Sequence, residues 1–113
     1  MDSATKINLD MLFEVFKGDR TQVAEVIRCF VEGFLQVEAD LDKAAITTDP
    51  DLLEKVSHKL KGSALNFNAS GIVSTALELE KMGKNNSMEG AVDKIQKLKQ
   101  ELKEFKVMIN EYL

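Results

Sequence analysis

The chain contains 113 residues, of which 44% are hydrophobic and 30% are charged, and its formal net charge is −4. This length corresponds to a single domain over residues 1–113 with one hydrophobic core, and the composition excludes intrinsic disorder. Because acids and bases are mixed along the chain and no apolar run is long enough to span a bilayer, we expect neither nucleic acid nor a membrane as a partner.

Apolar periodicity and turn signals predict five helical segments. A short helix over residues 8–17 is expected to end at Gly18, and residues 1–6 before it are expected to be frayed. The second helix is predicted to run without interruption over residues 19–45. Its apolar residues Val23, Ile27, Phe30, Phe34 and Leu41 keep an alternating four–three spacing, with Val37 close to the position between the last two.

A strong start signal precedes the third helix, because Asp49 can cap it and Pro50 suits its first position. Ser70 is expected to cap a fourth helix, which Gly83 and the polar residues 84–87 are expected to end, and the last helix is predicted over residues 88–113. The apolar seams of these three helices are Leu53, Val56, Leu60, Ala64 and Phe67; Ile72, Val73, Ala76, Leu77 and Leu79; and Ile95, Leu98, Leu102, Phe105, Ile109 and Tyr112.

Each apolar seam must be covered by another helix, and short loops force neighbouring helices to run antiparallel. We therefore predict an all-α fold, an up-down-up-down antiparallel four-helix bundle with a short extra N-terminal helix. The alternative, a fragment of a coiled coil, needs one long heptad pattern. The breaks at Asp49-Pro50 and Asn85-Asn86-Ser87 argue against it.

The single histidine, His58, is the candidate functional residue. A helix turns by about 100° per residue, which places His58 roughly 160° from the centre of its apolar seam and therefore towards solvent. Gly62 shares this outward face one turn later, although glycine costs a helix about 1 kcal/mol relative to alanine. Packing against another helix does not explain a glycine that points away from the core. We expect it to let another molecule come close to the imidazole.

Basic and apolar side chains complete the face around His58. Lys61 can swing its ammonium over the imidazole ring, and Lys55 and Lys59 add to a local positive field. Leu65, two turns beyond, adds an apolar surface suited to docking. A neutral imidazole is a nucleophile at pH 7, and a positive field suits a phosphoryl group of about −1.5 to −2 charges. A lone surface histidine most often has no function, but these neighbours favour one that could carry a phosphoryl group.

The motif His58-x-x-Lys61-Gly62-Ser63-Ala64, followed by Leu77, Glu80 and a long final helix, resembles the histidine-containing phosphotransfer (HPt) domains of multistep phosphorelays. The resemblance covers nearly the whole chain. It implies that His58 takes phosphate from a receiver-domain aspartate, or from a kinase, and delivers it to the receiver domain of another response regulator. It also implies that Lys61 steadies the phosphoryl oxygens, and that Gly62 makes room for a receiver docked beside the second and third helices.

The resemblance has two departures. Many relatives have Gly-Ala after the histidine helix, whereas this chain has Asn68-Ala69; asparagine tolerates the left-handed conformation, so we expect little change. The related chemotaxis-kinase phosphoacceptor domains often carry a second histidine on the fourth helix. Residues 76–80 contain none, which favours the phosphorelay type. The implied partners are receiver domains and a hybrid sensor histidine kinase.

The sequence bears on two other function classes. An autonomous enzyme is disfavoured, because the sequence has no phosphate-binding loop or dinucleotide fingerprint, and one histidine with one cysteine cannot build a zinc or di-metal centre. We expect a cytoplasmic, monomeric phosphocarrier with no cofactor or metal of its own, Mg²⁺ being supplied by the receiver, and an inert Cys29. The remaining alternative is a non-catalytic helical-bundle interaction module, which leaves the coincidence of His58, Lys61 and Gly62 unexplained.

Overall fold

A computed structural model describes residues 7–112 of the chain, except for the side chain of Tyr112. These residues contain helices and no strand, so the all-α prediction is confirmed. The expected fraying of residues 1–6 and the expected burial of Tyr112 fall outside the described part. The elements in chain order are α1 (Asp10–Val15), α2 (Arg20–Glu32), α3 (Phe34–Ile46), α4 (Pro50–Leu65), α5 (Ser70–Lys84), α6 (Ala91–Ile109) and the 3₁₀ turn η2 (Asn110–Tyr112).

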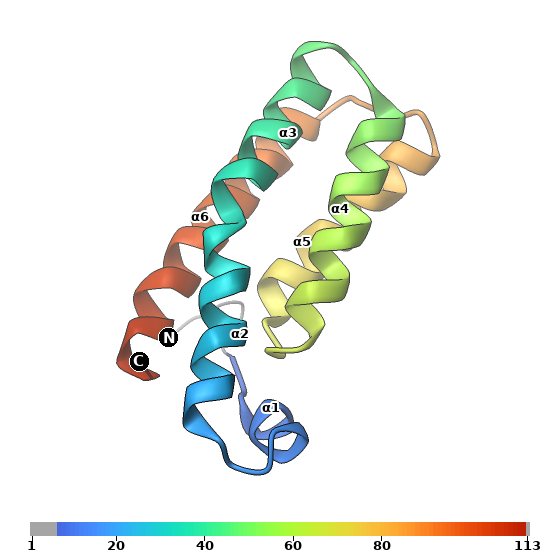
Figure 1. Ribbon diagram of the computed structural model, residues 1–113. Helices are drawn as coiled ribbons and strands as arrows, with labels where there is room; N and C mark the ends of the chain where they lie inside the picture. The colour runs from blue at the N-terminus through green and yellow to red at the C-terminus, as the bar shows by residue number, and fades with distance from the viewer. Residues whose placement is uncertain (1–6, 113) are drawn as a thin grey trace.

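The uninterrupted second helix of the sequence prediction is wrong, because α2 and α3 are separated at Gly33. Gly33 keeps a right-handed backbone with φ −78° and ψ −10°. Its carbonyl still accepts a hydrogen bond from Val37 N at 3.1 Å, so α3 continues in nearly the direction of α2 (Figure 1). The spacing of Phe30 and Phe34 runs across the junction, and for this reason the apolar pattern alone does not reveal it.

The two turn signals around α4 and α5 had different outcomes. Asp49 Oδ1 accepts a hydrogen bond at 3.1 Å from a backbone N–H in the first turn of α4, and Pro50 is the first residue of that helix, as predicted. Asn68 has the expected left-handed backbone, with φ +49°. Ser70 is not the N-cap, because α5 already begins at Ser70 and Ala69 occupies the cap position.

Other helix boundaries differ from the prediction by a few residues. The first and last helices are shorter than expected, and α6 begins only after Gly90, whose φ is +83°. Helix α5 ends at Lys84, directly after Gly83 and within the stop signal predicted over residues 83–87. A Cβ atom added at Gly83 would lie 2.6 Å from the carbonyl oxygen of Pro50, so this glycine lets α5 pack closely on the start of α4.

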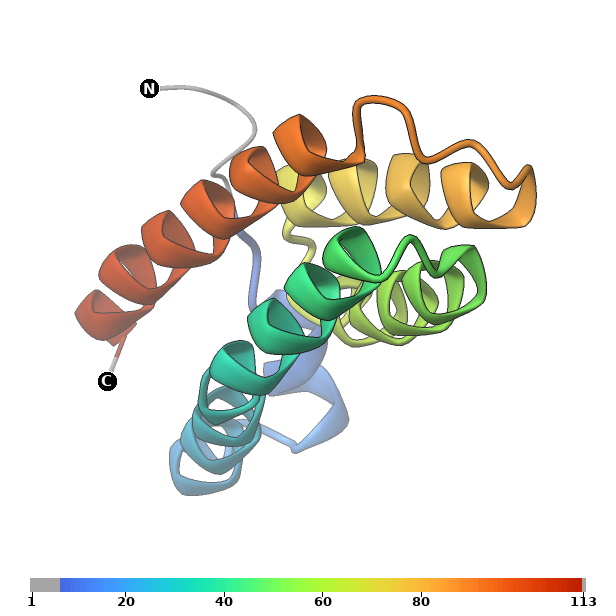
Figure 2. The same cartoon turned by 90° about the horizontal axis from the view of Figure 1, so that it is seen from above.

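Helices α3, α4, α5 and α6 pack around one core, in which α4 contacts α3 and α5, and α6 contacts α5 and α3. Successive helices in this set reverse direction along the long axis, while α1 lies at the end where α2 begins (Figure 1). Seen from above, α6 and α2 diverge from each other (Figure 2). No helix within residues 7–112 is long and apolar enough to cross a membrane.

The core is built from the predicted apolar seams. Phe30, which is half-buried, stacks on Phe67 with ring centroids 4.6 Å apart, and Phe105 lies edge-on to Phe67 at 5.5 Å. This aromatic cluster ties α2 and α6 to the α4–α5 turn. The fully buried members of the predicted seams are Val23, Ile27, Phe34, Leu41, Leu53, Leu60, Ala64, Phe67, Ile72, Ala76, Leu79, Ile95, Leu98, Leu102, Phe105 and Ile109.

Candidate functional site

His58 lies on the outer face of α4, where the helical periodicity placed it. Its side chain is 69% exposed, whereas its neighbours Ser57 and Leu60 on the same helix are buried. The ring is mounted on a regular sixteen-residue helix whose opposite face packs into the core. This arrangement holds the imidazole at a fixed position on the surface.

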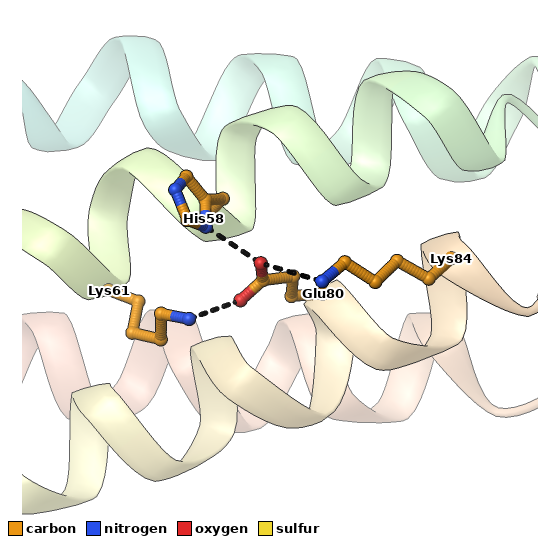
Figure 3. Close-up of polar contacts among 4 residues, drawn as sticks. All are labelled: His58, Lys61, Glu80 and Lys84. Atoms are coloured by element: carbon orange, nitrogen blue, oxygen red, sulfur yellow. Dashed lines mark hydrogen bonds and ion pairs between the residues drawn. The ribbon is translucent and has the colours of Figure 1, made fainter.

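One carboxylate from α5 connects side chains of both helices (Figure 3). Glu80 Oε2 lies 2.7 Å from Nδ1 of His58, and Glu80 Oε1 lies 2.6 Å from Nζ of Lys61. Lys84, one turn further along α5, places its Nζ 3.7 Å from Oε2. The Glu80 side chain is only 3% exposed. A nearly buried carboxylate is therefore compensated by a hydrogen bond and two ammonium groups, as burial of a charge requires.

The charge of Glu80 determines which nitrogen of His58 carries a proton. The hydrogen bond from Lys61 lowers the pKa of the Glu80 carboxyl, burial opposes this effect, and the hydrogen bond from His58 lowers the pKa further. The carboxyl is therefore ionised at neutral pH and can only accept hydrogen bonds. We assign the proton to Nδ1, which donates it to Oε2. In a neutral ring this leaves the lone pair on Nε2, which points away from Glu80 in Figure 3.

Lys61 does not lie over the imidazole ring, contrary to the sequence-based expectation. Its side chain is 22% exposed and its ammonium is turned to Glu80 (Figure 3). The physical reason is that an ionised carboxylate forms a charge-assisted hydrogen bond, which is stronger than any contact with a neutral ring. Lys61 and His58 are thus linked through Glu80.

Gly62 is exposed on α4, one turn beyond His58. A Cβ atom added there would meet no atom within 4 Å, in contrast to Gly83, where it would collide with backbone. The structure therefore offers no packing reason for a glycine at position 62. Its absent side chain leaves open surface directly beside the imidazole.

The other predicted site residues are placed on two flanks of α4. Lys55 is on the outer face, but its ammonium pairs with Asp51 at 2.9 Å, which raises the pKa of Lys55 and partly neutralises its field. Leu65 is 51% exposed at the end of α4. Lys59 lines the groove on the side of α4 that faces α3 and does not contact Glu80.

A groove of about 340 Å³, here called the α3–α4 groove, runs between α4 and the α2–α3 segment. It lies on the flank of α4 that faces α3, next to the helix face that carries His58. Exposed Cys29 is at its edge. Its lining residues are Cys29, Phe30, Gly33, Phe34, Gln36, Val37, Asp40, Val56, Lys59, Leu60 and Ser63.

Glu80 and Lys84 were not predicted as site residues. The sequence does contain a signal for Glu80, which follows Ile72 and Ala76 at successive four-residue spacings. This spacing places a carboxylate on the buried face of its helix. Such a carboxylate requires cationic partners. Within residues 7–112, no group of three or more His, Cys, Asp or Glu side chains could hold a metal ion.

Comparison with known proteins places this geometry in a family. A family model described as the Hpt domain matches residues 25–107, a span that includes the whole cluster around His58. No curated protein and no solved structure matches the chain. Hpt domains are phosphocarrier modules that act in histidine phosphotransfer with receiver domains in two-component phosphorelays. Because the match extends over most of the chain, from α2 through α6, this protein belongs to the Hpt domain family.

Proposed function

We propose that this protein is a phosphorelay intermediate that accepts a phosphoryl group on Nε2 of His58 from the aspartyl phosphate of one receiver domain and delivers it to the aspartate of another. The observation that carries the proposal is an exposed imidazole whose Nδ1 lies 2.7 Å from an oxygen of a nearly buried carboxylate. His58 is also the one histidine in the sequence.

In the proposed reaction, the lone pair of Nε2 attacks the phosphorus atom and forms an N–P bond. The P–O bond of the aspartyl phosphate breaks, and its electron pair returns to the carboxylate oxygen of the receiver. Glu80 acts as a positioning residue, because its hydrogen bond fixes both the orientation of the ring and the tautomer that has a free Nε2.

Lys61 and Gly62 have separate roles in this proposal. An ammonium has three N–H donors, so Lys61 can keep its bond to Glu80 and still donate to a phosphoryl oxygen. Gly62 allows the receiver backbone to approach the imidazole. The receiver covers the outer face of α4 and the α3–α4 groove, with Lys55, Lys59 and Leu65 as contacts around His58.

The phosphate source is a hybrid sensor kinase acting through its receiver, and the protein has no nucleotide site or cofactor, with Mg²⁺ bound by the receiver. It works as a cytoplasmic monomer and binds neither nucleic acid nor membrane. Its helices form an up-down-up-down four-helix bundle.

Transfer of labelled phosphate tests this proposal directly. Phosphorylated receiver domains are incubated with the protein and with His58→Gln, which removes its one histidine. We expect acid-labile label on the wild type and none on the variant, while the melting temperature stays similar because His58 is exposed. Label retained by His58→Gln would contradict the assignment.

A second candidate function, that of an interaction module, is favoured by a separate surface. A groove of about 820 Å³ lies between the α2–α3 segment and α6, and exposed Leu35 and Val107 line it. Such apolar side chains can support binding of another protein. If this is the main function, His58→Gln should retain the biological activity of the wild type.

A further inference from the structure

The position of the Nδ1 proton has a consequence for the phosphorylated state, given the proposed function. Nε2 attacks phosphorus while Nδ1 keeps its hydrogen, so the product ring carries a phosphoryl group on one nitrogen and a proton on the other. Such a ring is an imidazolium, with one positive charge. When it gives up the phosphoryl group, the ring leaves as neutral imidazole. If Nδ1 had lost its proton, the ring would have to leave as an imidazolate anion, which is a far poorer leaving group.

We infer that Glu80 keeps Nδ1 of phosphorylated His58 protonated, and thereby holds the phosphoryl group in a form that is ready for transfer. The carboxylate is already in place, with Oε2 2.7 Å from Nδ1 and only 3% of the side chain exposed. Acceptance and delivery then balance without any proton movement: the N–P bond forms and breaks while the Nδ1–H bond persists. A carrier of this kind transfers reversibly, and its rate should not depend on pH as long as Nδ1 stays protonated.

The other charged groups near the ring include cations that oppose protonation of Nδ1, so the negative charge of Glu80 is needed to offset them. Lys61 on α4 and Lys84 on α5 both approach Glu80, and their positive charges disfavour an imidazolium nearby. Glu54 lies one turn before His58 on α4, next to Lys55, which is paired with Asp51. On the far flank of α4, Asp40 of α3 and Lys59 line the α3–α4 groove. Of these groups, Glu80 supplies the negative charge that hydrogen-bonds to Nδ1.

Glu80→Gln removes the negative charge at this position but keeps the hydrogen bond, because the amide oxygen can still accept from Nδ1. Glu78→Gln is the matched control, since Glu78 is on the same helix but pairs with Lys94 of α6. Both variants and the wild type are phosphorylated chemically with phosphoramidate, so that loading does not depend on a receiver. The pH at which Nδ1 loses its proton is followed by ¹⁵N NMR, and transfer to a receiver is timed over the same pH range.

We expect the titration midpoint of phosphorylated Glu80→Gln to be lower by about one pH unit, as a charge-assisted hydrogen bond is replaced by a neutral one. Above that midpoint its transfer rate should fall about tenfold per pH unit, and its phosphohistidine should live longer. Glu78→Gln should match the wild type. An unchanged midpoint and rate profile in Glu80→Gln would overturn the inference, whereas a wild type that carries no label from a receiver would overturn the proposed function instead.

Lys84→Gln provides an independent test if Glu80→Gln does not fold. Lys84 is 57% exposed, so its replacement should leave the fold intact. Removal of this cation should raise the midpoint, opposite in sign to Glu80→Gln, by a few tenths of a pH unit because solvent screens exposed charges. A lower midpoint in Lys84→Gln would contradict the charge balance described above.

Discussion

Replacement of Gly62 by glutamine tests whether this glycine gives a partner access to His58 or serves internal packing. A Cβ atom at this position meets nothing within 4 Å, so a larger side chain should extend into solvent without strain. Glutamine is favoured over glycine in a helix by roughly 0.5–1 kcal/mol, and we expect the free energy of unfolding to increase by that amount. For a chain of this size, this corresponds to a rise of roughly 2–6 °C in the melting temperature.

Phosphotransfer should change in the opposite direction. The glutamine side chain stands one turn from His58 on the same outward face and blocks the approach of a receiver. We expect the transfer rate to fall at least tenfold, measured as loss of label from a phosphorylated receiver. Gly62→Ala should gain similar stability and lose less activity, because a methyl group extends less far from the helix. Ser74→Gln, at an exposed position of α5, controls for added bulk elsewhere.

Two results would refute this reasoning about Gly62. If the glutamine variant melts at a lower temperature, the surrounding surface is not open and the glycine serves packing. If it is more stable but transfers at the wild-type rate, no partner backbone approaches this face during the reaction.

Three further predictions concern the phosphate source and the cluster around Glu80. Lys61→Ala should slow transfer and shorten the phosphohistidine lifetime with the fold retained, as measured by label decay and circular dichroism, because it removes the ammonium that we propose to bind the phosphoryl group. The purified protein should acquire no label from ATP alone, and should acquire it when a cognate kinase and receiver are added. The lowered pKa of Glu80 means that its ionised form stabilises the fold above pH about 4.5 and that this contribution is lost as the pH falls through the folded-state pKa. In urea denaturation, the stability difference between wild type and Glu80→Gln should therefore shrink below that pH.

The sequence predicts the faces of the helices well, because burial depends on a local period. The outward position of His58 follows from its angle relative to Leu53, Leu60 and Ala64, which are all buried. The break at Gly33 could not be predicted in this way, since the apolar spacing continues through it.

The partners of His58 could not be predicted, because they depend on how far α5 is displaced along α4. Periodicity places Glu80 on the buried side of α5 but does not say which residue of α4 it meets. For the same reason, periodicity does not reveal that Lys61 pairs with Glu80, and its ammonium was expected over the imidazole ring. This register between helices is a tertiary property, and in this protein a backbone contact at Gly83 helps to define it.

The last prediction follows from that contact. An added Cβ at Gly83 would lie 2.6 Å from the carbonyl oxygen of Pro50 and 2.7 Å from the backbone N of Glu54, and side-chain rotation cannot relieve a collision with backbone. Gly83→Ala should therefore separate α4 from α5 and lower the stability by about 1–3 kcal/mol.

Glu54 and Gly83 are each about one turn from the pair formed by His58 and Glu80, so the separation of the helices should also lengthen the 2.7 Å hydrogen bond between Nδ1 and Oε2. We expect faster solvent exchange of the Nδ1 proton in NMR spectra and slower phosphotransfer by the folded fraction. Gly62→Ala adds the same methyl group to open surface and should leave the Nδ1 signal unchanged. If Gly83→Ala retained both the wild-type stability and the wild-type Nδ1 signal, close packing at Gly83 would not be what aligns Glu80 with His58.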